Sequence, residues 1–122
     1  MNTLTVCLGS NAQMAAHHID KAVDFISALA EIKHDTGPYL SDPEKSAAGP
    51  RYTNRILILE AVGDCDYFHS LCKHYESRER SSTVEEGRVT IDIDIVVCDG
   101  EVLRPLDFAS AYFRKGMTML KI

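Results

Sequence analysis

The sequence predicts an α+β domain with the ferredoxin-like arrangement, in which an antiparallel sheet carries its helices on one face. Segments with the alternating apolar pattern of strands take turns with segments whose apolar residues recur at helical spacing. Their order along the chain is β-α-β-β-α-β, which is that of the split βαβ fold. The length of 122 residues is typical of a single domain, so we expect one domain over residues 1–122.

The first third of the chain is predicted to form a strand, a helix and a second strand. Apolar residues alternate over 4–8, and the pattern ends at the turn-forming sequence Gly9-Ser10-Asn11. From about Ala15 to Ala30 they recur at intervals of three and four residues, which indicates an amphipathic helix. A short strand is expected over 31–36, where a Gly-Pro pair ends it.

The middle of the chain is predicted to hold two loops around a strand and a helix. Residues 40–51 are rich in turn-forming residues and read as a long loop. Residues 52–62 have an Ile-Leu-Ile-Leu centre that is apolar on both faces, which indicates a central strand. Asp64 or Asp66 could cap the second helix. The charged segment 77–87 is expected to be the second loop.

Residues 89–98 give the clearest strand pattern in the chain. One face, predicted to pack on the helices, would carry five β-branched residues: Val89, Ile91, Ile93, Ile95 and Val97. The face directed away from the helices would carry the alternate residues: Thr90, Asp92, Asp94, Val96 and Cys98. A turn at Asp99-Gly100 would lead to a short returning strand at 101–103.

Composition excludes several classes of function. A net charge of −5 and a pI of about 5.4 argue against general affinity for nucleic acid or anionic membranes. No segment approaches the ~18–20 apolar residues of a membrane span, and the first residues lack the pattern of a signal peptide. One basic cluster is either a focused anion site or a solvated helix end, and composition leaves both open: Lys73, Arg78, Arg80 and Arg88.

The four cysteines bear on the compartment. Cys7, Cys65, Cys72 and Cys98 form no Cys-x-x-Cys pair and lie in apolar or helical segments. We therefore predict buried free thiols in a reducing compartment, which points to the cytoplasm.

Asp92 and Asp94 are the residues that most strongly suggest chemistry. Same-face neighbours on a strand lie about 6.5–7 Å apart, so their carboxylates can lean around one hard cation or flank two. Mg²⁺ usually takes one or two carboxylates together with substrate phosphates. The competing interpretation is a solvated sheet face. Asp is disfavoured in strands and two like charges repel, so we favour the metal.

The segment Thr90-Ile91-Asp92-Ile93-Asp94-Ile95 resembles the Thr-(Ile/Leu)-Asp-(Ile/Leu)-Asp-(Ile/Leu) signature of the 6-hydroxymethyl-7,8-dihydropterin pyrophosphokinases of the folate pathway. Further pieces are similar to that family in order and spacing, over roughly residues 4–120: Leu8-Gly9-Ser10-Asn11, Tyr39 followed by Tyr52-Thr53-Asn54, and Glu76. The resemblance implies ferredoxin-like architecture and transfer of a pyrophosphoryl group from MgATP to the hydroxymethyl oxygen of the pterin.

The resemblance also implies roles for individual residues. Asp92 and Asp94 would bind two Mg²⁺ ions that bridge the ATP phosphates. Asn54 would read the amide edge of the pterin, because its amide offers both a donor and an acceptor. The other implied contacts are Tyr52 and Ser41 for the pterin, Glu76, Arg78, Ser110, Arg114 and Lys115 for ATP, and Arg80 and Arg88 for catalysis.

Three features depart from the family's pattern. The family usually has Gly-Pro-Arg-Thr before the Asp pair, but Val89 holds the arginine position here, and Arg88 can substitute only if the strand begins after it. The family's Pro-His element aligns with Ala109-Ser110, and a serine cannot supply the charge of a histidine. The chain stops at Ile122, where the family normally continues for some tens of residues.

Three hypotheses therefore stand. The chain is a compact pterin pyrophosphokinase, with ATP and a pterin as its small-molecule partners. Alternatively, it is a catalytically weak or inactive relative that binds a pterin, a nucleotide or a protein. A third possibility is a metal-dependent phosphotransferase with a different acceptor. The sequence leaves the oligomeric state open.

Overall fold

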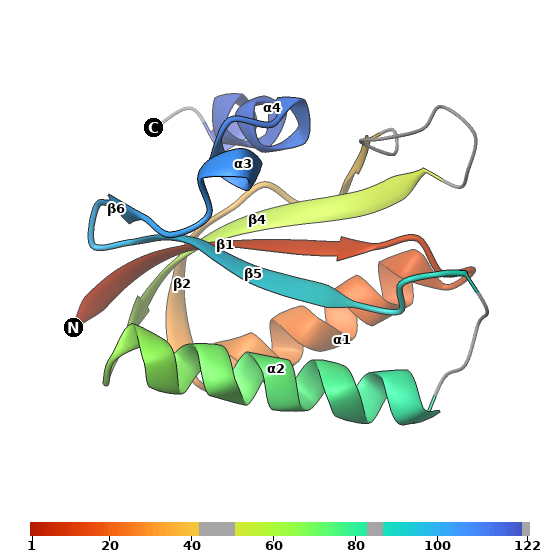
Figure 1. Ribbon diagram of the computed structural model, residues 1–122, viewed down its shortest axis with the longest axis horizontal. Coiled ribbons are helices and arrows are strands. Elements are labelled where there is room, and N and C mark those ends of the chain that lie inside the picture. The colour runs from red at the N-terminus through yellow and green to blue at the C-terminus, as the bar shows by residue number, and fades with distance from the viewer. Residues whose placement is uncertain (42–50, 83–86, 121–122) are drawn as a thin grey trace.

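The computed structural model describes residues 1–41, 51–82 and 87–120, in which six strands form one antiparallel sheet (Figure 1). The strands are β1 (Asn2–Ser10), β2 (Ala30–Asp35), β3 (Tyr39–Ser41), β4 (Tyr52–Ala61), β5 (Asp92–Cys98) and β6 (Glu101–Val102). The helices are α1 (Ala15–Ser27), α2 (Cys65–Ser82), α3 (Pro105–Phe108) and α4 (Ala111–Leu120). The predicted ferredoxin-like α+β fold with an antiparallel sheet is confirmed.

The order of the strands puts β1 at the centre of the sheet. The hydrogen-bonded order is β2-β4-β1-β5-β6, and β3 pairs with the beginning of β4. Both neighbours of β1 run antiparallel to it, so each of residues 6–9 faces a residue of β4 on one side and a residue of β5 on the other. This register positions the candidate site.

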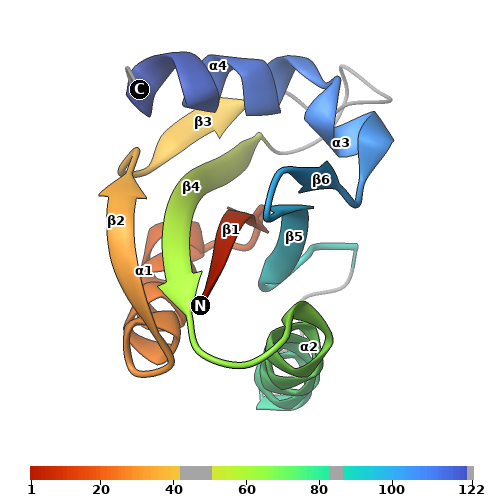
Figure 2. The ribbon, with the colours of Figure 1, turned by 90° about the vertical axis from the view of Figure 1, so that its left-hand side faces the viewer.

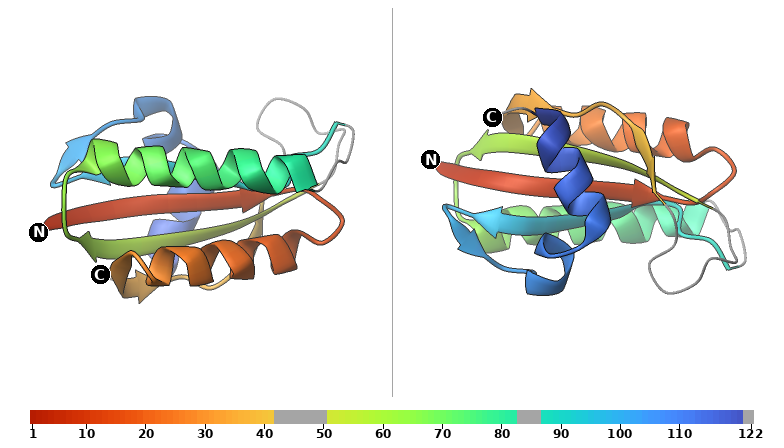
Figure 3. Two further views of the ribbon diagram at one scale, coloured as in Figure 1. Left: turned by 90° about the horizontal axis from the view of Figure 1, so that it is seen from below. Right: turned by 90° about the horizontal axis from the view of Figure 1, so that it is seen from above.

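The helices α1 and α2 lie side by side on one face of the sheet, as the sequence predicts (Figure 3). The ring of Phe25 stacks on that of Tyr75 with centroids 4.3 Å apart, and the ammonium of Lys21 lies 2.7 Å from the carboxylate of Glu79. The buried apolar side chains of β1, β4 and β5 that face these two helices form the larger core.

Helices α3 and α4 lie on the opposite face of the sheet, which the sequence analysis did not anticipate (Figure 2). Phe113, Met117 and Leu120 of α4 recur at helical spacing and pack toward Cys7, Ile56 and Val96 of the sheet in a second, smaller core. Gly116 allows the close approach, because a Cβ there would overlap the side chains of Ile56 and Tyr39. The sheet is therefore covered on both faces.

The helix α2 is longer than predicted. The segment 77–87, expected to be a loop, continues the helix as far as Ser82, so Arg78 and Arg80 are helical, and its residues 83–86 lie outside the described residues. Arg and Glu are strong helix formers, and no Gly or Pro interrupts the segment before Gly87. The predicted loop at 40–51 is wrong for Leu40 and Ser41, which belong to β3, and its residues 42–50 lie outside the described residues.

Strand β5 is shorter than predicted and changes face near its end. It begins at Asp92 instead of Val89, and Ile93 and Ile95 face α1 and α2 as expected. A β-bulge then inserts an extra residue, because Val6 faces Ile95 whereas Thr5 faces Val97. As a result Val97 packs in the smaller core and Cys98 in the larger one, the reverse of the prediction.

The bulge brings Cys98 to Cys65 at the start of α2, where the two form a disulfide. The prediction of four free thiols is therefore wrong for this pair. It rested on the absence of a Cys-x-x-Cys pair, whereas these two cysteines are separated by 33 residues and meet only in the tertiary structure. Cys7 and Cys72 are free and buried, as expected. The predicted turn at Asp99-Gly100 is present, with positive φ angles at both residues.

Among the residues described, no helix combines the length and the apolar character that crossing a membrane requires.

Candidate functional site

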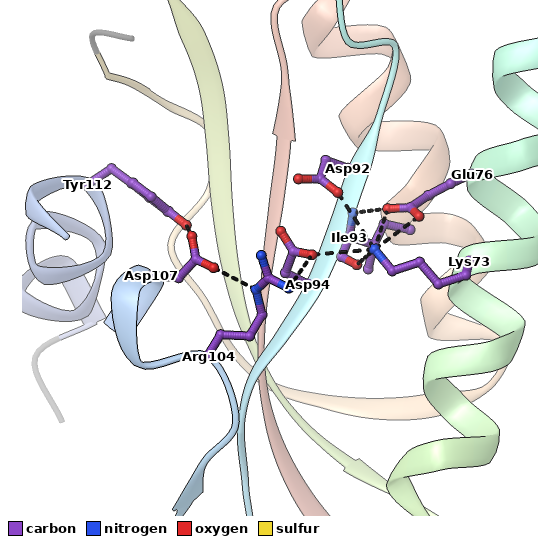
Figure 4. A network of polar contacts seen from close by, with 8 residues as sticks. All are labelled: Lys73, Glu76, Asp92, Ile93, Asp94, Arg104, Asp107 and Tyr112. Atoms are coloured by element: carbon purple, nitrogen blue, oxygen red, sulfur yellow. Dashed lines mark hydrogen bonds and ion pairs between the residues drawn. The ribbon is translucent and has the colours of Figure 1, made fainter. Parts of the chain in front are cut away.

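Asp92 and Asp94 open β5 on the face of the sheet that points away from α1 and α2 (Figure 4). Asp92 lies opposite Gly9 of β1, and Asp94 lies opposite Cys7, which belongs to the smaller core. The two carboxylates differ in environment: the Asp94 side chain is 11 % exposed and that of Asp92 is 50 % exposed. The sequence thus predicted the face of this pair correctly.

Two residues of α2 contact the free edge of β5 between these carboxylates. The Glu76 carboxylate accepts a hydrogen bond from the backbone N–H of Ile93, and the Lys73 ammonium donates to the carbonyl oxygen of Ile93 at 3.0 Å. Both side chains thus form hydrogen bonds with backbone groups of Ile93 at the free edge of the strand, where no neighbouring strand among the described residues is available to do so. Glu76 is 4 % exposed and lies within α2, so it is a buried residue and not a surface carboxylate at a helix end.

The ammonium of Lys73 also lies among three carboxylates. Its Nζ is 3.1 Å from Oε2 of Glu76, 3.3 Å from Oδ1 of Asp94 and 3.7 Å from Oδ1 of Asp92. From the sequence, Lys73 was predicted only as one member of a basic cluster. The available signal was its (i, i+3) spacing to Glu76, which places both side chains on one face of the helix.

A second cation approaches Asp94 from the other side (Figure 4). A terminal nitrogen of Arg104 lies 3.7 Å from Oδ1 of Asp94. The Nε of Arg104 lies 2.5 Å from a carboxylate oxygen of Asp107 in α3, and the other oxygen of Asp107 accepts a hydrogen bond from the hydroxyl of Tyr112 at 2.7 Å. Arg104 and Asp107 were not predicted from the sequence, because their proximity to β5 depends on how α3 is packed.

Burial, followed by the proximity of the carboxylates, has the largest effect on the electrostatics of the cluster. Burial and the charge of Asp92 raise the pKa of Asp94 to about 6, against the opposing effect of Lys73 and Arg104. Burial lowers the pKa of Lys73, but the charges of Asp94 and Glu76 outweigh that effect and raise it overall. The repulsion between Asp92 and Asp94 is therefore only partly relieved.

This donor set fits Mg²⁺. Four carboxylates face two cations, which leaves two negative charges: Glu76, Asp92, Asp94 and Asp107 against Lys73 and Arg104. The described residues contain no group of three or more His, Cys, Asp or Glu side chains that could hold a metal ion. A pair of carboxylates is nevertheless what Mg²⁺ uses when phosphate oxygens complete its coordination.

A row of residues across the sheet connects Asp92 with Asn54. Gly9 of β1 lies opposite Asn54 of β4 on one side and opposite Asp92 of β5 on the other. Side chains of directly paired residues share a face, so both project from the same face, about 10 Å apart across two strand spacings. Gly9 places no side chain between them. The charge of Asp92 contributes, after burial, to the raised pKa of Tyr52, which lies two residues before Asn54.

Three residues predicted to contact the pterin lie together. Asn54 is 5 % exposed, and its amide nitrogen donates a hydrogen bond to the hydroxyl of Ser41. Ser41 of β3 is the paired neighbour of Tyr52. The amide oxygen of Asn54 lies on the side of Gly9, because a Cβ added to that glycine would be 3.5 Å from it. This half of the predicted site is therefore contiguous in the structure.

Three cationic residues predicted for catalysis and nucleotide binding lie at the end of α2 and before β5. Arg88 precedes β5, which meets the condition under which it could replace the family's arginine, and it donates to the carbonyl of Asn11 at 2.9 Å. The guanidinium of Arg78 lies 5.8 Å from the ring centre of Tyr75, and Arg80 is exposed on α2.

The residues predicted near the carboxyl end contact the backbone around α3 and α4. The Ser110 hydroxyl donates to the carbonyl of Asp107 at 2.6 Å and accepts from the N–H of Phe113 in the first turn of α4. Arg114 donates to the carbonyl of Ala109 at 3.3 Å. Lys115 donates to the carbonyl of Leu40 in β3 at 3.2 Å. Their predicted contacts with ATP stay predictions.

Comparison with known proteins gives one finding. A family model described as 7,8-dihydro-6-hydroxymethylpterin-pyrophosphokinase (HPPK) matches residues 5–120, which run from β1 to the end of α4. The search of the curated proteins found no match.

Proposed function

This chain belongs to the 7,8-dihydro-6-hydroxymethylpterin-pyrophosphokinase family, whose role is in folate biosynthesis, and we propose that it transfers pyrophosphate from MgATP to 6-hydroxymethyl-7,8-dihydropterin. The observation that carries this proposal is the row formed by Asn54, Gly9 and Asp92. In this row a side-chain amide and a carboxylate pair lie on one face of a rigid sheet, and the residue between them, Gly9, has no side chain. Such a reaction depends chiefly on positioning and on charge neutralisation.

The pterin half of the proposed site consists of Asn54, Tyr52 and Ser41. An amide side chain can donate to and accept from the amide edge of a pterin at the same time. Ser41 supports this by holding the amide nitrogen of Asn54, which fixes the orientation of the side chain. Tyr52 would border the ring on the side of Asp92, so the hydroxymethyl group would point toward the carboxylates.

The phosphate half of the proposed site consists of Asp92 and Asp94, which would hold Mg²⁺ that accompanies ATP. When bound, Mg²⁺ neutralises and orients the phosphate oxygens. Lys73 and Arg104 lie beside this pair and add positive charge. We carry the other assignments as part of the proposal: Arg80 and Arg88 in catalysis, and Glu76, Arg78, Ser110, Arg114 and Lys115 at the nucleotide.

The test is formation of AMP from MgATP and 6-hydroxymethyl-7,8-dihydropterin, followed by chromatography. AMP should require both substrates. Asp92→Ala should abolish AMP formation and Mg²⁺-dependent nucleotide binding while the protein stays folded, because half of this side chain is exposed. Asp24→Ala, in an exposed residue of α1 on the other face of the sheet, is the matched control. Absence of AMP formation at high protein concentration would contradict the catalytic proposal.

A non-catalytic binding module is the second candidate function. It is favoured by the two cations that flank Asp94 and by Ser110, which aligns with the family's histidine. Calorimetry separates the two candidates. Mg²⁺-dependent binding of a nonhydrolysable ATP analogue supports the enzyme, whereas pterin binding without any nucleotide binding by the folded chain supports the module.

A further inference from the structure

We propose that Asn11 is the positioning residue that holds Arg88 at the end of β1, so that Arg88 takes the place of the arginine that the family carries where this chain has Val89. This inference deepens the proposed function and rests on it for the catalytic role of Arg88. Asn11 is 7 % exposed and lies two residues beyond Gly9, which stands between the two halves of the proposed site. Its position is therefore tied to the central strand of the sheet.

Three different groups of Asn11 contact the segment that leads into β5. Its backbone N–H donates to the carbonyl oxygen of Val89 at 3.1 Å, and its side-chain Oδ1 accepts from the N–H of Val89 at 2.6 Å. Its own carbonyl oxygen accepts from a terminal nitrogen of Arg88 at 2.9 Å. In a regular antiparallel pair this carbonyl would accept the N–H of Val89. The side-chain amide makes that bond instead, and the carbonyl is available to the guanidinium.

Ser10 binds the same segment from a neighbouring position. Its hydroxyl donates to the carbonyl oxygen of Val89 at 3.1 Å and accepts from the backbone N–H of Ala12 at 3.3 Å. Ser10 is fully buried, so its hydroxyl has a fixed environment. Both backbone polar groups of Val89 are therefore bonded to the turn after β1, which restrains the backbone that carries the adjoining Arg88.

The register before β5 contains one extra residue. Gly9 pairs with Asp92, whereas Asn11 bonds to Val89, so two steps along β1 correspond to three steps along the facing segment. One extra residue reverses the direction of the side chains on its far side. The arginine of this chain also stands one residue earlier than that of the family. The displacement of Arg88 in the sequence is thus matched by one extra residue in the structure.

A guanidinium held in this way suits a phosphate-binding role. It has five N–H donors, of which the bond to Asn11 uses one, and Arg88 is exposed to solvent and so to an arriving substrate. Fixing the cation before the reaction removes part of the entropy cost of placing it during the reaction. Loss of the Asn11 side chain should therefore lower kcat more than it changes the KM of either substrate.

The experiment is a double-mutant cycle on AMP formation from MgATP and 6-hydroxymethyl-7,8-dihydropterin, with Asn11→Ala, Arg88→Met and the double variant. Asn11→Ala should lower kcat about 10- to 100-fold and change either KM less than about threefold. In the Arg88→Met background it should have no further effect, because Asn11 acts through Arg88. Asn11→Asp, which keeps an oxygen that accepts the N–H of Val89, should retain near wild-type kcat. Asn2→Ala is the matched control, because Asn2 bonds to the carbonyl of Gly63 at the other end of β1.

Modification of arginines by phenylglyoxal, quantified by mass spectrometry of the peptides, tests the same contact without catalysis. Arg88 should react about fivefold faster in Asn11→Ala than in the wild type, which corresponds to the loss of one hydrogen bond. Arg80, which is exposed on α2, should react equally in both proteins and serves as the internal reference. If Asn11→Ala does not fold, Asn11→Leu, which is close in size and has no acceptor, replaces it in both measurements.

Three results would overturn the inference: equal reactivity of Arg88 in the wild type and Asn11→Ala, losses of kcat that multiply in the double variant, or equal losses in Asn11→Asp and Asn11→Ala. Failure of the proposed function gives a different result. If the wild type forms no AMP, the catalytic proposal fails, while faster modification of Arg88 in Asn11→Ala still supports its positioning by Asn11.

Discussion

Asn54 and Asp92 lie opposite the same residue of the central strand, one on each side of it. Their separation is thus set by the spacing of hydrogen-bonded strands and not by the conformation of a loop. A site built on such a frame is held in place by the whole sheet, which favours accurate positioning of two substrates.

Replacement of Asn54 by Ala should weaken pterin binding about 10- to 100-fold and leave MgATP binding unchanged. Loss of a buried hydrogen-bonding partner costs about 1–3 kcal/mol, which corresponds to this range. The binding of each substrate can be measured by calorimetry. Thr53→Ala is the matched control, because the neighbouring residue points to the other face of the strand. An equal loss of affinity for both substrates would show that Asn54 maintains the fold and does not bind the pterin directly.

Side chains added at Gly9 should block the site while the sheet stays intact. A Cβ at this position would lie 3.5 Å from the amide oxygen of Asn54 and 3.7 Å from the ring of Tyr52, both ordinary contacts. Gly9→Ala should therefore melt within a few degrees of the wild type, and Gly9→Val should lose pterin binding more severely than Gly9→Ala. Thermal unfolding and calorimetry check the two parts. Wild-type pterin affinity in Gly9→Val would place the pterin elsewhere.

The ionisation of Asp94 should lower stability as the pH rises in metal-free solution. Its pKa is about 6 in the folded protein, raised by burial and by Asp92 from an ordinary value of 3.8. Between these values the folded state binds more protons than the unfolded state, so the free energy of unfolding falls with rising pH. The contribution is about 2 kcal/mol between pH 4 and pH 7.

Urea unfolding of the wild type and of Asp94→Asn, both in EDTA, tests this pH dependence. The variant lacks the ionising carboxyl, so its free energy of unfolding should fall less between pH 4 and pH 7 than that of the wild type. The difference in stability between variant and wild type should therefore shift in favour of the variant as the pH rises. Parallel pH profiles for the two proteins would contradict the prediction. Metal binding to the wild type should weaken as the pH falls through 6, because protons compete for Asp94.

Reduction of the Cys65–Cys98 disulfide should destabilise the fold by about 2–4 kcal/mol, since the bond closes a loop of more than thirty residues. Urea unfolding with and without dithiothreitol measures the effect. A Cys65→Ala/Cys98→Ala variant should not respond to the reductant, which separates this bond from Cys7 and Cys72. If the oxidised wild type shows four free thiols, the assignment is wrong. The result also bears on the predicted cytoplasmic location, because reducing compartments keep thiols free.

Several features were predictable from sequence because they depend on local pattern. The alternation around Asp92 and Asp94 indicated the face of β5 that carries them, and the turn at Asp99-Gly100 followed from residues that tolerate positive φ. The extent of α2 was missed, although its Arg and Glu residues favour a helix, because a charged segment was interpreted as a loop. The exchange of faces at Val97 and Cys98 could not be predicted from the alternation of apolar residues. One extra residue in a bulge reverses the faces of all residues after it, and the alternation does not reveal where the bulge lies.

By itself, the sequence determined the order of the elements, the carboxylate pair and the residues that resemble the pterin site, because periodicity and motif spacing are local properties of the chain. Only the tertiary structure decided that Lys73 and Arg104 flank Asp94, that α4 covers the second face of the sheet, and that Asn54 and Asp92 share Gly9 as a neighbour. These relationships join residues that are distant in the chain. They depend on strand register and helix packing, which are set by contacts throughout the core and not by any local segment.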